Sequence, residues 1–129
     1  MAPSRMLSVE VMTMSNDVEA EGELNLVTLR GRVSGTPTAR DLPSGSSIVT
    51  VRVAVGRAKT HMTSGSKQTS DWVDCVAWAP RWRRSVGSWR VGDTVEIEGS
   101  LRRRFFRTEG GSNSRVEVEV LKGRVISRA

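Results

Sequence analysis

The chain has 129 residues, the length of a single domain. Hydrophobic residues make up 37% and charged residues 26%, which predicts a folded domain, and no stretch reaches the roughly 18 apolar residues that a membrane helix needs. Cys75 is the only cysteine and His61 the only histidine, which excludes an internal disulfide framework and Cys- or His-rich metal sites. We therefore expect no metal and no cofactor.

The charge is high and unevenly distributed. Twenty Lys and Arg against fourteen Asp and Glu give a net charge of +6, and seventeen of the twenty bases are arginine. Residues 1–23 hold one base and five acids, a net of −4, whereas residues 24–129 hold nineteen bases and nine acids, a net of +10. Such a body attracts polyanions, of which nucleic acid is the commonest. The alternative is an arginine-rich solvated surface.

Residues 1–23 have no hydrophobic period, so we expect a disordered leader there and a folded domain over residues 24–129. Met14 is an alternative start. No sustained apolar stretch follows a basic start, as a secretory signal requires, and the acids argue against a transit peptide. We therefore expect a cytoplasmic protein.

From Leu24 onward the hydrophobic period is two, which predicts half-buried strands. The first strand covers residues 24–33. Prolines and glycines over residues 35–45 predict a turn. The second strand, residues 47–56, places valines on one face and Thr50 with Arg52 on the other.

Residues 57–70 are small and polar, which predicts a mobile hairpin loop before a third strand over residues 71–78. Trp72 and Trp78 share one face of that strand. Pro80 then suits the first turn of a short helix that extends to about Trp89.

Two strands follow the helix. The first of them covers the stretch from Thr94 to Arg107. One face of this strand carries Val95, Ile97 and Leu101, and the other carries Arg102, Arg104 and Phe106. The last strand covers residues 115–126, with its valines aligned. Five strands with a helix between the third and fourth predict an all-β, partly open Greek-key barrel, the OB-fold. A five-stranded sandwich or an SH3-like barrel is the structural alternative.

The polar faces of the second, third and fourth strands predict one ligand surface, since we expect these strands to be neighbours in the barrel. The surface would combine arginines with aromatic rings: Thr50, Arg52, Trp72, Trp78, Arg102, Arg104 and Phe106. Unpaired bases stack on rings, at about 1–3 kcal/mol per base, while guanidinium groups follow the phosphates. This pattern is typical of single-stranded nucleic acid binding. Ordinary aromatics at the edge of the core are the alternative for Trp72 and Trp78.

Three stretches resemble the bacterial single-stranded DNA-binding proteins over about residues 24–126. They are LVTLRGRVSGTPTAR (26–40), DWVDCVAWAPRW (71–82) and GDTVEIEGSLRRRFF (92–106). The resemblance implies an OB-fold that binds single-stranded DNA largely without sequence specificity, in replication, recombination or repair. It also implies a homotetramer, or a dimer, associated with the nucleoid.

Residue by residue, the resemblance implies base stacking at Trp72, Trp78 and Phe106. It implies phosphate contacts at Arg102 and Arg104 and ligand-facing positions at Thr50 and Arg52, with Lys59 as the nearest match to a further stacking residue. Asp74 stands where a basic residue is common, and we expect it to pair with Arg52. The sequence ends at VISRA, without the acidic tail through which relatives recruit replication and repair proteins, so we expect either a natural short form or a truncated chain.

The competing interpretation is an interaction module that resembles primosomal replication protein N, a short relative that binds replication proteins as well as single strands. An enzyme is not expected, because the sequence offers no nucleophile–base pair, metal cluster or phosphate-binding glycine loop.

Overall fold

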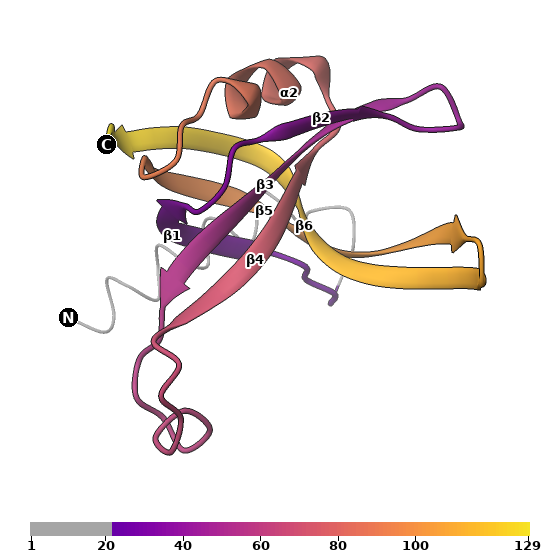
Figure 1. Ribbon diagram of the computed structural model, residues 1–129. Coiled ribbons are helices and arrows are strands. Elements are labelled where there is room, and N and C mark those ends of the chain that lie inside the picture. Colours follow the sequence, from indigo (N-terminus) through magenta and orange to yellow (C-terminus); the bar gives the residue numbers. More distant parts are fainter. Residues whose placement is uncertain (1–21) are drawn as a thin grey trace.

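The computed structural model describes residues 22–129. Six strands and a helix make up this part of the chain: β1 (Val27–Val33), β2 (Thr38–Asp41), β3 (Ser47–Gly56), β4 (Ser70–Ala77), α2 (Pro80–Gly87), β5 (Thr94–Thr108) and β6 (Gly111–Ser127). The strand order is β1-β5-β6-β4-β3-β2, and β1 also pairs with β3, so the strands close into a ring (Figure 1). The predicted all-β OB-type barrel with one short helix after the third long strand is confirmed.

The valine-rich faces predicted from the period of two form the core. Val51 lies opposite Cys75 on β4, and Val53 lies opposite Val73. Val51, Val53 and Cys75 are fully buried. Burial raises the pKa of the Cys75 thiol to about 12, so this side chain is a neutral core residue.

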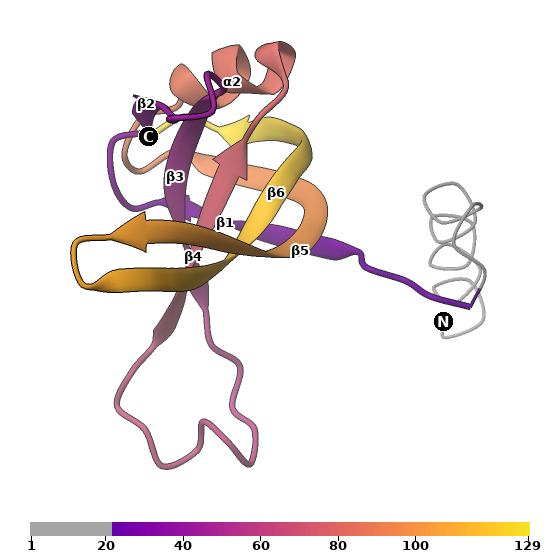
Figure 2. The same cartoon turned by 90° about the vertical axis from the view of Figure 1, so that its right-hand side faces the viewer.

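Helix α2 closes one end of the barrel, where it packs against β3, β4 and β6 (Figure 2). Pro80 occupies its first turn, as predicted. The helix ends at Gly87, two residues before Trp89, and the Trp89 N–H donates to the carbonyl of Val86. Val86 and Trp89 are buried, so this segment covers the core.

Strand β2 lies inside the segment that the sequence predicts as a turn. Its four residues pair with β3, and Thr38 lies opposite Thr50 while Asp41 lies opposite Ser47. All four side chains are exposed, so the strand carries no apolar alternation that would reveal it. β2 and the turn that follows form one wall of the groove described below.

The β5–β6 pairing shifts register between Glu98 and Gly99, which leaves Leu121 as an extra residue on β6. A side chain at Gly99 would collide with the carbonyl oxygen of Glu119, so glycine permits the close approach of the two strands there. Beyond this bulge the two strands leave the barrel as a hairpin. Leu101 lies opposite Val118, which is buried in the core, yet Leu101 itself is 51% exposed.

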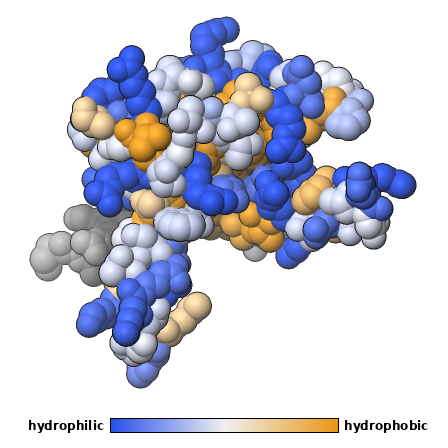
Figure 3. All heavy atoms as spheres, viewed as in Figure 1, coloured by the Kyte–Doolittle hydropathy of each residue, from blue (hydrophilic) through white to orange (hydrophobic). Residues whose placement is uncertain are grey.

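Three connections extend from the barrel: the β2–β3 turn, the β3–β4 loop and the β5–β6 hairpin (Figures 1 and 2). Hydrophilic residues predominate on the loop and the hairpin (Figure 3).

The predicted leader, residues 1–23, falls outside the described residues except for Gly22 and Glu23. Within residues 22–129, no helix has the length and apolar character to cross a membrane. In the same range, no three His, Cys, Asp or Glu side chains are grouped as a metal site.

Candidate nucleic-acid interface

The register brings the predicted outer faces of β3 and β4 together. Thr50 lies opposite Val76, and Arg52 lies opposite Asp74. The expectation that β4 and β5 are also neighbours is wrong, because β6 lies between them. The physical reason is the parallel pairing of β4 with β6, in which Val76 lies beside Glu119. The outer surface therefore includes acidic side chains of β6 between the arginines of β5 and the aromatics of β4.

A groove of about 750 Å³ lies between the β2–β3 turn and the β5–β6 hairpin. Trp78 and Phe106 both line it, although Trp78 directly follows β4 and Phe106 lies on β5. Arg40, Asp41, Leu42, Pro43, Ser44, Arg104, Phe105, Arg107 and Ser112 complete the lining. A second hollow, of about 410 Å³, lies alongside and shares Arg40. Thr50, Arg52, Asp74 and Arg115 are among its walls.

Each of the three predicted arginines on this face is bound to a carboxylate. Arg52 Nε donates to Asp74 at 2.9 Å, which is the predicted pairing and raises the pKa of Arg52. Arg102 Nε donates to Glu119 at 3.1 Å. The side chains of Arg52 and Arg102 are about half exposed.

The third pair is largely buried. Arg104 donates through Nε and Nη2 to the two carboxylate oxygens of Glu117, at 2.8 and 3.1 Å. The Glu117 side chain is 1% exposed and that of Arg104 is 18% exposed. The bond to Glu117 raises the pKa of Arg104, so this guanidinium stays charged.

Guanidinium groups also lie over the aromatic rings. Arg52 lies 5.7 Å from the ring centroid of Trp72. Arg104 and Arg115 lie 5.9 and 5.4 Å from the ring centroid of Phe106. These distances are within the range of cation–π attraction, which helps to hold the rings in place.

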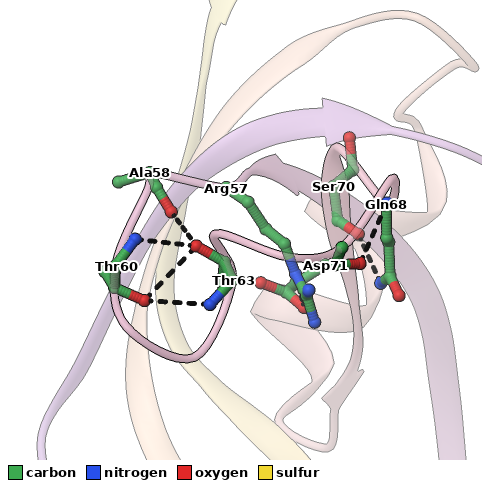
Figure 4. Close-up of polar contacts among 8 residues, drawn as sticks. Arg57, Ala58, Thr60, Thr63, Gln68, Ser70 and Asp71 are labelled. Atoms are coloured by element: carbon green, nitrogen blue, oxygen red, sulfur yellow. Dashed lines mark hydrogen bonds and ion pairs between the residues drawn. The ribbon is translucent and has the colours of Figure 1, made fainter.

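Lys59 and Trp72 lie apart from the groove, toward the β3–β4 loop. Trp72 is 68% exposed and lies near the start of β4, just after that loop. Within the loop, Thr60 and Thr63 exchange hydrogen bonds between backbone N–H and hydroxyl groups, and Thr63 Oγ1 donates to the carbonyl of Ala58 (Figure 4). The loop predicted to be mobile thus carries its own hydrogen bonds.

Sequence reasoning missed three arginines at these grooves: Arg40, Arg107 and Arg115. Arg40 is the final residue of the first resembling stretch, which is the one signal that would have found it. Arg107 and Arg115 flank the tip of the hairpin, and nothing in the sequence separates them from the other arginines.

The family model that matches is the "Single-strand binding protein family", over residues 24–126. The chain belongs to this family. Its members are DNA-binding proteins and not enzymes, which agrees with the absence of catalytic motifs in the sequence.

Relatives and solved structures of the family are similar to this chain. Single-stranded DNA-binding protein A of Bacillus subtilis is 30% identical over 88 residues, which is 68% of this chain and 50% of that protein. The single-stranded DNA-binding protein of Aquifex aeolicus is 28% identical over 105 residues, 81% of this chain and 71% of that protein. The chain spans about half the length of the first of these relatives.

Among solved structures, the Plasmodium falciparum SSB complex with ssDNA matches with a TM-score of 0.63 and 26% identity. The match covers 84% of this chain and 98% of that one.

Proposed function

We propose that this protein binds single-stranded DNA largely without sequence specificity. The observation that supports the proposal is the groove between the β2–β3 turn and the β5–β6 hairpin, which both Trp78 and Phe106 line. Rings in such a groove accept unpaired bases by stacking, which tolerates any base because every base has a π-face. Family membership and the similarity to a complex with single-stranded DNA support the same ligand.

The proposed interface comprises the eight residues predicted from the sequence together with the groove. Trp72, Trp78 and Phe106 stack bases; Thr50, Arg52, Lys59, Arg102 and Arg104 contact the backbone. We further propose that the protein acts in the cytoplasm at the nucleoid, as a homo-oligomer, in replication, recombination or repair.

A second candidate is an interaction module for replication proteins. The observation that favours it is an exposed apolar side of the β5–β6 hairpin: Leu101, Phe105 and Val116 are 51%, 72% and 46% exposed. Their cross-strand partners place all three on the side of the hairpin opposite Phe106. An interaction module without DNA binding would leave tryptophan fluorescence unchanged when single strands are added.

We expect oligo-dT to quench the tryptophan fluorescence, and we expect the quenching to come from Trp72 and Trp78. Replacing both by phenylalanine should abolish most of the change while a ring remains for stacking. Trp82→Phe is the matched control, because Trp82 lines a different hollow, beside Lys122 and Arg124. Quenching that depends on Trp82 and not on Trp72 or Trp78 would contradict the assignment of the face.

We also expect a preference for strand type but not for sequence. Oligo-dT and mixed-sequence single strands should bind within about tenfold of each other, because stacking does not distinguish bases strongly. Duplex DNA should bind much more weakly, because its bases are not available to Trp78 and Phe106. Competition against labelled oligo-dT measures both ratios. If duplex and single strands bound equally, with equal salt dependence, the surface would be a nonspecific basic surface and the proposed stacking of bases would be contradicted.

A further inference from the structure

Carboxylates compensate the arginines that the sequence singles out. Asp74, Glu117 and Glu119 each hold one of them, at 2.9, 2.8 and 3.1 Å. A phosphate that approaches such an arginine also approaches the carboxylate beside it. Attraction and repulsion then largely cancel, since both act at nearly the same distance. These three pairs therefore add little net attraction for a polyanion.

Three other arginines border the same two grooves with charge in excess. No carboxylate of residues 22–129 lies within 4.0 Å of the Arg40 or Arg107 guanidinium. Arg115 lies 3.8 Å from Glu117, but Arg104 already neutralises that carboxylate. Arg104, Arg115 and Glu117 together thus carry one net positive charge, which lies at the exposed Arg115.

We propose that Arg40, Arg107 and Arg115 provide the net attraction for the phosphates of bound single-stranded DNA. Arg40 and Arg107 line the groove that holds Trp78 and Phe106. Arg115 lies over the Phe106 ring and lines the second hollow, which Arg40 also lines. A strand whose bases stack in the groove therefore has an uncompensated guanidinium on each side. This inference rests on the proposed binding of single-stranded DNA.

The experiment measures affinity for a labelled dT oligonucleotide of about 16 nucleotides, the upper site size of one OB-fold, at several salt concentrations. Wild-type protein is measured first, and a failure to bind contradicts the proposed function rather than this inference. Arg40→Gln is then expected to flatten the plot of log affinity against log salt by about 0.7, the value for one phosphate contact on a single strand.

The matched control is the double variant Arg57→Gln/Asp71→Asn, which removes a compensated pair at 2.9 Å, outside both grooves, without changing the net charge. We expect its affinity and its salt slope to equal those of the wild type. Glu119→Gln alone releases Arg102 and is expected to tighten binding and steepen the slope by about 0.7. All these side chains are at least partly exposed, and thermal unfolding checks that each variant folds.

The proposal is overturned if the double variant flattens the slope, if Arg40→Gln leaves it unchanged, or if Glu119→Gln fails to steepen it. Any of these results, obtained with a wild type that binds, leaves single-stranded DNA binding in place and assigns the phosphates to other arginines.

Discussion

Alanine at Trp78 or at Phe106 is expected to weaken the binding of single-stranded DNA by about 1–3 kcal/mol each, or about fivefold to 150-fold in Kd. Each substitution removes one ring from the groove between the β2–β3 turn and the hairpin. Arg104 on β5 and Arg115 on β6 both lie over the ring of Phe106 and help to hold it in place. The ring therefore needs little reorganisation before a base stacks on it. Equilibrium titration with a labelled dT oligonucleotide measures the loss.

Phe106→Trp is the matched variant, since it keeps a flat aromatic surface at the same position. We expect it to bind at least as tightly as the wild type. Trp78 is only half-buried, so circular dichroism and thermal unfolding are needed to show that Trp78→Ala keeps the fold. Folded alanine variants that bind single strands like the wild type would show that the bases stack elsewhere.

The barrel was predictable because its strands carry strict alternation. Val51 and Val53 lie on one face of β3 and Arg52 on the other, and only one orientation of such a strand buries the valines. The same logic predicted that Arg52 and Asp74 share a face, and the register places them opposite each other.

The order of the strands in the sheet was harder to predict from the sequence than the residues that form each strand. The polar residues of β6 alternate like those of any half-buried strand, so Glu117 and Glu119 were recognisable as outward-facing positions only. Their contacts with Arg104 and Arg102 follow from the register of the β5–β6 hairpin, which runs without a shift from the Thr108–Gly111 pair to the Gly99–Val120 pair. What no local pattern in the sequence encodes is the long-range parallel pairing that places β6 between β4 and β5.

The groove was missed for a related reason. Its wall at Arg40 belongs to β2, four exposed residues between prolines, where turn chemistry outweighs any strand signal. Phe106 and Trp78 were both predicted as stacking residues, but their meeting in one groove follows from the way the hairpin leaves the barrel.

Arg104→Ala is expected to destabilise the fold by about 3–5 kcal/mol, the cost of leaving a buried charge without its partner. Glu117 is 1% exposed, and Arg104 supplies both of its short hydrogen bonds. Arg115, at 3.8 Å, is too far from Glu117 to replace them without moving. Urea unfolding followed by circular dichroism gives the change in the free energy of unfolding.

The double variant Arg104→Leu/Glu117→Leu distinguishes the effect of the unpaired charge on stability from the effect of lost packing. We expect it to recover most of the lost stability, because replacing both members of a buried ion pair by apolar residues of similar size is often neutral. A loss below about 1 kcal/mol for Arg104→Ala, the value for an exposed pair, would contradict this account. Arg104 and Glu117 line a hollow together with Val76 and Trp78, so the pair supports the base of the stacking groove. Loss of DNA binding in Arg104→Ala must therefore be compared with its loss of stability before a phosphate contact is assigned to Arg104.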